Sequence, residues 1–173
     1  DVSSITTKKI KTYTEKKSLI YAPTQVGKTD AMIHVIKDFI KRGISVVISS
    51  DNKKDQMDQL VKRLTCAKID NVFEHTLIVM VGNKNFVNFV EEYIESEYET
   101  FIICCLDNAS QIAKVYETIS IVHEEDDIHR LLVIHDEGDI TNKSRNVELV
   151  ESGVAKSHKE WINFFTRLSN KSI

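Results

Sequence analysis

Hydrophobic and polar residues follow two patterns along this chain, one of strand length and one of helical spacing. Short runs of apolar and β-branched residues predict buried strands at residues 18–21, 44–49, 77–81, 101–106 and 131–134. Apolar residues recur at helical spacing over residues 31–40, 57–64, 86–94, 112–122 and 161–168. This alternation of strands and helices predicts an α/β fold with a mainly parallel central sheet flanked by helices.

Polar residues and glycine mark the predicted boundaries. Gly43 is suited to a left-handed helix C-terminal cap, and residues 50–52 and 107–110 supply capping groups for the helices that follow. In the last helix, Ser157 and Glu160 are spaced as a capping box. We therefore expect the last helix to begin at Ser157.

Composition restricts the class of protein. The chain has 173 residues, of which 42% are hydrophobic, which is enough for one globular core over residues 17–173 behind a basic lead-in at residues 1–16. Its apolar runs are far shorter than the roughly 20 residues of a membrane helix. We expect a soluble intracellular, cytoplasmic protein (in the host cytoplasm if viral) with no membrane partner. The first residue, Asp1, suggests a piece of a larger protein.

Cysteines and charge sharpen this expectation. Cys66, Cys104 and Cys105 lack metal-ligand spacing and are interpreted as reduced core thiols. The net charge of −3 is uneven, because residues 1–69 hold 14 Lys and Arg against 7 Asp and Glu, whereas residues 70–173 hold 9 against 19. The basic half could face a polyanion, although a solvated lysine-rich lead-in explains the early lysines equally well. The acidic run at residues 124–127 is interpreted as a solvated loop.

A candidate phosphate loop lies between the first predicted strand and the first predicted helix. Its residues after Ala22 are Pro23, Thr24, Gln25, Val26, Gly27, Lys28 and Thr29. A loop at such a junction directs backbone N–H groups and a helix N-terminus at one point, which suits an anion. Lys28 adds an ammonium group for the β and γ phosphates, and Thr29 adds a hydroxyl for Mg²⁺. The predicted ligand is ATP or another nucleoside triphosphate with Mg²⁺.

An acidic cluster follows the fifth predicted strand. His135, Asp136, Glu137 and Asp139 surround Gly138 directly after four apolar residues. Carboxylates at the end of a buried strand are costly unless a cation or hydrogen bonds compensate them. Parallel strands bring their carboxyl ends to one edge, where ligands bind. We expect Asp136 to hold the water shell of Mg²⁺ and Glu137 to orient or deprotonate the attacking water.

These two motifs together resemble those of the first RecA-like domain of a superfamily 2 (DEAD/DEAH-like) helicase. Residues 22–29 resemble motif I and residues 136–139 resemble motif II. With Gln25 in place of the commoner glycine, residues 24–29 are similar to the same motif in helicase-like ATPases of viral or Z1 type. The resemblance implies a P-loop NTPase fold and a DNA or RNA partner. It also implies that Asp139 couples hydrolysis to motif III and that a second RecA-like domain, absent from this chain, supplies an arginine finger. Residues at the places of motifs Ia and Ib would contact nucleic acid: Ser49, Ser50, Asn52, Lys53, Asp107 and Asn108.

Other functions stay open at this stage. A nucleotide kinase or GTPase would share the phosphate loop but lacks a clear base-reading motif or arginine-rich lid here, and a non-catalytic nucleotide-dependent switch or assembly module would not need Glu137. The aromatic residues near residues 86–94 favour core packing over base stacking. Arg42, Arg63 and Arg130 are expected at the far edge of the sheet, so the chain alone should be a poor ATPase.

Overall fold

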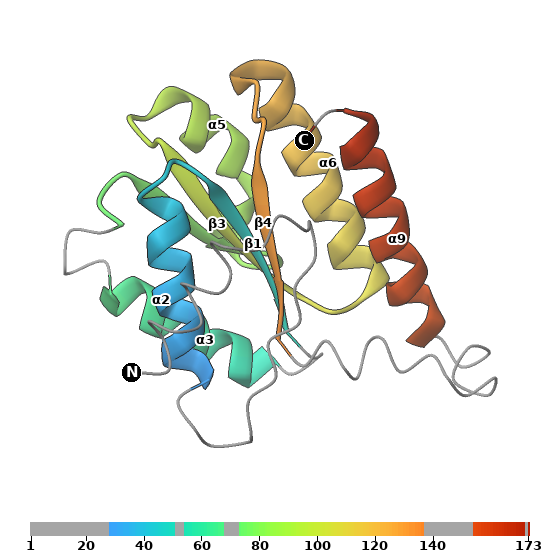
Figure 1. Ribbon diagram of the computed structural model, residues 1–173, viewed down its shortest axis with the longest axis horizontal. Helices are drawn as coiled ribbons and strands as arrows, with labels where there is room; N and C mark the ends of the chain where they lie inside the picture. Colours follow the sequence, from blue (N-terminus) through green and yellow to red (C-terminus); the bar gives the residue numbers. More distant parts are fainter. Residues whose placement is uncertain (1–27, 51–53, 68–72, 137–153, 172) are drawn as a thin grey trace.

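A computed structural model describes residues 28–50, 54–67, 73–136, 154–171 and 173, and Figure 1 shows its elements. In chain order these are α2 (Lys28–Ile40), β1 (Ser45–Ser50), α3 (Lys54–Ala67), β2 (Thr76–Met80), α4 (Lys84–Val87), α5 (Phe89–Glu95), β3 (Thr100–Leu106), α6 (Ala109–Asp126), β4 (Leu131–His135) and α9 (Val154–Asn170). The first predicted strand, at residues 18–21, lies outside the described residues. The other four strands lie within one residue of their predicted bounds.

The described strands form one sheet in the order β2-β3-β1-β4. All three strand pairs are parallel, and Val47 of β1 is in register with Ile103 of β3 and Val133 of β4. The predicted α/β fold with a parallel sheet is therefore confirmed at this level. Its relation to RecA-like domains stays a prediction.

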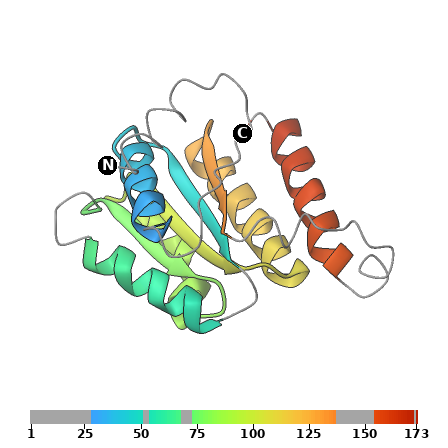
Figure 2. The same ribbon diagram turned by 60° about the horizontal axis from the view of Figure 1, so that its bottom comes forward.

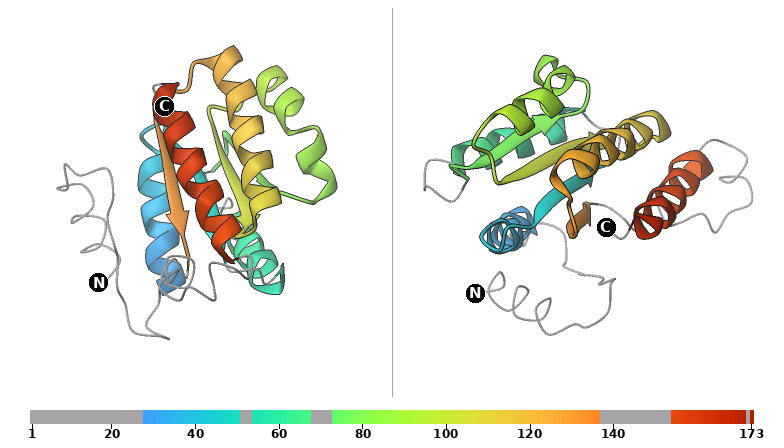
Figure 3. Two further views of the ribbon diagram at one scale, coloured as in Figure 1. Left: turned by 90° about the vertical axis from the view of Figure 1, so that its right-hand side faces the viewer. Right: turned by 90° about the horizontal axis from the view of Figure 1, so that it is seen from above.

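Helices cover both faces of the sheet, as Figures 2 and 3 show. On one face, α2 and α3 pack on even-numbered strand residues, with Ile36, Met57, Val46, Ile48, Ile102 and Cys104 in the core. On the other face, α5, α6 and α9 pack on odd-numbered residues, with Phe89, Ile112, Trp161, Val47, Phe101 and Cys105 in the core. This division follows from the period of two in a strand, where consecutive side chains point to opposite faces.

The order of the strands accounts for the placement of the helices. The step from β1 to β2 passes β3 in one direction, and the step from β3 to β4 passes β1 in the other. Parallel strands are connected with right-handed crossovers, so steps in opposite directions place their helices on opposite faces. Accordingly α3 packs on one face and α6 on the other.

Several local predictions hold. Gly43 has a φ of 69°, the left-handed conformation expected after α2. The Asn108 side chain caps α6 by accepting a hydrogen bond of 3.0 Å from the backbone N–H of Gln111. Rings of the segment at residues 86–94 pack in the core, with Phe89 and Tyr93 buried and 5.9 Å apart.

Other local predictions were wrong. Helix α9 begins at Val154, so Ser157 lies inside it and is not the cap, because the alanine and lysine after Val154 are good helix formers and extend the helix backwards. The segment at residues 86–94 is two short helices that meet at Asn88, which leaves Val87 83% exposed. The acidic run at residues 124–127 is solvated but ends α6 rather than forming a loop.

Two further observations concern cysteines and membranes. Cys104 and Cys105 are buried free thiols, as predicted, whereas Cys66 is exposed on α3 because it lies on the side of that helix that faces away from Met57 and Leu64. In the part of the chain that the structure describes, no helix has the length and apolar character needed to cross a bilayer.

Candidate nucleotide site at the carboxyl edge of the sheet

The start of α2 carries the described part of the candidate phosphate loop. Lys28 is the first residue of this helix, and Thr29 is half-buried in its first turn. The first backbone N–H groups of a helix have no partner within the helix and carry a partial positive charge, which favours a phosphate. The remaining predicted loop residues, Pro23, Thr24, Gln25, Val26 and Gly27, lie outside the described residues.

Asp136 follows β4 and is half-buried. Its backbone N–H donates a hydrogen bond of 2.8 Å to the carbonyl oxygen of Ser49, which extends the pairing of β4 with β1 by one residue. In the strand alternation, Asp136 comes after Leu132 and Ile134, which pack against the cluster that contains α2. Asp136 is therefore on the α2 face of the sheet, while Glu137 and Asp139 lie outside the described residues.

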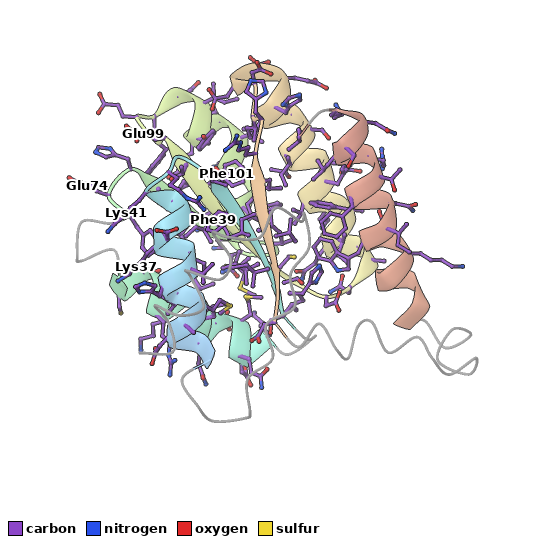
Figure 4. All side chains as sticks on the ribbon, viewed as in Figure 1. Lys37, Phe39, Lys41, Glu74, Glu99 and Phe101 are labelled. Atoms are coloured by element: carbon purple, nitrogen blue, oxygen red, sulfur yellow. The ribbon has the colours of Figure 1, made fainter. Side chains whose placement is uncertain are left out.

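The structure brings the start of α2 and Asp136 to the same edge. Helix α2 runs antiparallel to the strands, so its first turn lies where the strands end. Figure 3 shows the β4 arrow and the first turn of α2 ending on the same side of the molecule. Lys37 and Lys41 lie toward the opposite end of the helix, as Figure 4 shows. Two motifs that are about 100 residues apart in the sequence thus meet at one edge and on one face.

The predicted nucleic-acid residues occupy the same edge but differ in exposure. Ser49 and Ser50 end β1 and are buried, so their hydroxyl groups do not face solvent. Asp107 and Asn108 lie between β3 and α6 and are half-buried, and the backbone N–H of Asp107 donates a hydrogen bond of 2.8 Å to the carbonyl oxygen of Ser50. The other two predicted contacts, Asn52 and Lys53, lie outside the described residues.

A cluster of polar and aromatic side chains, which we call the ring cluster, joins the ends of three strands to α9. It consists of Ser49, Asp107, His135 and Trp161. The Ser49 Oγ and His135 Nδ1 atoms lie 2.7 Å apart in a hydrogen bond. The His135 ring meets the Trp161 ring edge-to-face with centroids 4.3 Å apart, and Trp161 Nε1–H donates a hydrogen bond of 2.8 Å to Asp107 Oδ1.

The ring cluster was not predicted from the sequence. The sequence held one indication of it: Ser49, Asp107 and His135 are all odd-numbered, and the odd-numbered residues of the strands point to the face that α9 covers. Burial lowers the pKa of His135 below its ordinary value of 6.5, and the Asp107 carboxylate opposes this effect without cancelling it. Burial therefore favours the neutral imidazole of His135, which can both donate and accept a hydrogen bond.

Three of the described arginines, Arg42, Arg63 and Arg130, line two hollows, whereas Arg167 of α9 stacks on the Tyr116 ring. Arg42 and Arg130 line a hollow of about 290 Å³ at the amino edge of the sheet, as expected. The prediction for Arg63 was wrong, because it lines an open hollow of about 560 Å³ together with Asp30 from the first turn of α2. Residues near the end of α3 and in the first turn of α2 line this hollow together, and the order of the elements in the sequence does not show that.

The residues at the edge suit a magnesium nucleotide. Mg²⁺ prefers oxygen ligands and is usually held by one or two carboxylates together with substrate phosphates. Thr29 and Asp136 supply a hydroxyl and a carboxylate at the same edge. In the described ranges, no group of three or more His, Cys, Asp or Glu side chains could hold a metal ion.

Comparison with known proteins gave no match. A scan against protein-family models and searches of curated proteins and of solved structures found no significant similarity to this chain.

Proposed function

We propose that this chain is the ATP-binding and ATP-hydrolysing first RecA-like domain of a superfamily 2 helicase or translocase that acts on DNA or RNA. One observation carries the proposal: Asp136 and the first turn of α2 lie at the same edge and on the same face of a parallel sheet. This is the arrangement that a phosphate loop and an acidic metal ligand require. The sequence motifs around these two points supply the remaining chemistry.

Each residue has a defined task in this proposal. The backbone of residues 23–27 and the first turn of α2 bind the phosphates, and the Lys28 ammonium neutralises the β and γ phosphates. Thr29 and Asp136 hold Mg²⁺, which when bound offsets charge on the phosphate oxygens. Glu137 accepts a proton from the attacking water, and Asp139 passes the state of the site to the downstream domain.

The handedness of the fold restricts where a parallel strand that leads into α2 can lie. Helices α2 and α3 cover the same face, so right-handed crossovers place any parallel strand that leads into α2 on the β4 side of β1. That strand would lie beyond β4. We expect one strand between it and β4, as in RecA-like ATPases, whereas direct adjacency would favour a kinase or GTPase.

Titration calorimetry with Mg²⁺-ATP tests the proposal. Lys28→Ala should lower affinity by at least about 100-fold, because no other group in the loop replaces its charge-assisted bonds. Lys41→Ala is the matched control, because it removes the same charge from an exposed residue just past the other end of α2. Equal affinity in the wild type and Lys28→Ala, or no binding by the wild type, would contradict the proposal.

Nucleic-acid binding needs a separate measurement. We expect weak, sequence-independent binding of single-stranded DNA or RNA near Asp107 and Asn108, through main-chain and polar side-chain contacts to the backbone. Fluorescence anisotropy at increasing salt should show falling affinity, because phosphate contacts release counterions. Salt-independent or undetectable binding, even with the downstream domain attached, would leave a nucleotide-binding protein that is not a nucleic-acid motor.

A further inference from the structure

At the ends of β1, β3 and β4, a residue of the ring cluster directly precedes a residue of the candidate site. Ser49 precedes Ser50, Asp107 precedes Asn108, and His135 precedes the proposed Mg²⁺ ligand Asp136. Since consecutive residues of a strand face opposite sides, the ring cluster lies behind the sheet as seen from α2. Trp161 is the one member that comes from outside the strand ends, and it contacts two of the other three.

Filling the core at this place does not require the polar atoms of the ring cluster. Trp161 is 4% exposed and lies among Phe164, Phe165 and His135, where an apolar side chain could fill the same space. A buried polar network is costly when one partner is missing, and it holds its members in one arrangement when all are satisfied. Here each contact is directional: two hydrogen bonds and one edge-to-face ring pair.

We infer that Trp161 is a positioning residue for the magnesium nucleotide, acting through His135 and Asp107 to hold Asp136 at the α2 face. This inference rests on the proposed function. Asp136 is fixed from two directions: its backbone N–H bonds to the Ser49 carbonyl, and its neighbour His135 is held between the Ser49 hydroxyl and the Trp161 ring. Helix α9 thereby helps to set the position of Asp136 through side chains on the opposite face of the sheet.

The test compares nucleotide affinity with Mg²⁺ and with EDTA, using the whole chain and calorimetry. The ratio of the two affinities measures how well Asp136 is placed for the metal ion. Trp161→Phe keeps a ring against His135 but loses the N–H bond to the Asp107 carboxylate. It should lower this ratio about tenfold, the effect of one hydrogen bond to a charged group. Affinity in EDTA should stay unchanged, because the first turn of α2 lies on the other face of the sheet.

The matched control is Leu168→Ala. Leu168 is buried on the same helix about two turns after Trp161, so the substitution loosens the packing of α9 without removing a ring that contacts Trp161. It should leave the affinity ratio unchanged. A loss equal to that of Trp161→Phe would show that the effect is only structural and would overturn the inference.

Fluorescence gives a second readout, because Trp161 is the only tryptophan in the chain. Mg²⁺-ADP should change its emission, and ADP in EDTA should not. Nucleotide binding that depends on Lys28, together with a full Mg²⁺ effect in Trp161→Phe, would overturn this inference and leave the proposed function standing. Absence of nucleotide binding in the wild type would overturn both. If circular dichroism shows that Trp161→Phe is unfolded, Ser49→Ala, which removes the hydroxyl bonded to His135, must show the same reduction for the inference to survive.

Discussion

The two faces of the sheet are built from different kinds of side chain. The face under α2 and α3 is mainly aliphatic, with Ile36, Ile48, Met57, Leu64 and Ile102 fully buried. The opposite face is aromatic, with Phe89, Tyr93, Phe101, Trp161 and Phe164 in its core. The aliphatic face carries the proposed nucleotide site, and the aromatic face carries the ring cluster.

This difference shows how two consecutive residues, His135 and Asp136, can serve both faces of the sheet. Aliphatic packing is largely non-directional, whereas aromatic rings and their polar atoms prefer defined geometries. His135 and Asp136 are consecutive, so one faces the aromatic side and the other faces α2. The ring cluster on the aromatic face can therefore hold Asp136 in place on the opposite face without occupying the space of the proposed nucleotide.

The largest expected effect concerns hydrolysis on the aliphatic face. The chain alone should turn over ATP about 10³- to 10⁵-fold more slowly than a complete motor, because the proposal assigns the arginine finger that neutralises charge on the transferred phosphate to a second RecA-like domain. Phosphate release should disappear in Glu137→Gln while nucleotide binding remains.

Arg63 makes this prediction sharper, because it is the described arginine that shares a hollow with the first turn of α2. Rapid hydrolysis by the monomer that is lost in Arg63→Ala would contradict the need for a second domain. Activity that rises steeply with protein concentration would instead indicate an arginine from a neighbouring subunit.

The next effect tests the aromatic face through stability. Phe101 is fully buried and meets the Phe89 and Tyr93 rings edge-to-face at 5.5 and 5.4 Å. Phe101→Ala should lower the free energy of unfolding by about 3–5 kcal/mol in urea denaturation. Ile102 is the matched position on the aliphatic face. Phe101→Leu should cost more than Ile102→Leu, which conserves volume and should cost less than about 1.5 kcal/mol. If Ile102→Leu costs more stability than Phe101→Leu, the edge-to-face contacts of Phe101 add no stability beyond ordinary packing.

Much of the fold was predictable because strand length and helical spacing report burial directly. The four described strands match their predicted ranges closely, since β-branched runs such as residues 45–48 have no favourable place outside a sheet core. The meeting of Thr29 and Asp136 at one edge followed from strand and helix direction alone. The break at Asn88 and the early start of α9 were missed, because apolar spacing does not show where a helix turns or how far it extends beyond its buried face.

The ring cluster could not be predicted for a different reason. Its contacts depend on which strands are neighbours and on where α9 docks, and both are properties of the whole sheet. His135 is adjacent to Ser49 only because β4 pairs with β1. Arg63 was misplaced for a related reason, since the position of α3 relative to the first turn of α2 depends on packing and not on the order of the elements.

An effect of pH is expected from a thiol on the aliphatic face. Burial raises the pKa of Cys104 from 9.0 to about 12. A raised pKa in the folded state stabilises the fold below pH 9 and withdraws that stability as pH rises toward 12. The loss should approach about 1.4 kcal/mol per pH unit within this window.

Urea denaturation at pH 8 and about pH 10 measures this effect. Cys104→Ala should show a weaker decline than the wild type, while the exposed Cys66→Ala should match the wild type. Cys105, on the other face, and Tyr93 also have raised pKa values, so a decline remains in Cys104→Ala. A decline identical to that of the wild type would contradict the assignment to Cys104.

The smallest expected effect concerns the cap of α6, the helix that covers the aromatic face. Asn108 accepts the Gln111 N–H, and removing such a cap costs about 1 kcal/mol. Asn108→Ala should lower stability by that amount, while Asn108→Asp, which keeps an acceptor oxygen, should retain most of it. Ser110→Ala is the control, because Ser110 is exposed in the first turn. Asn108 is also a candidate nucleic-acid residue, so its two roles are separable: Asn108→Asp should preserve the helix but weaken nucleic-acid binding by adding a negative charge beside the phosphates. If Asn108→Ala lowers stability and Asn108→Asp does not weaken nucleic-acid binding, the role of Asn108 is confined to capping α6.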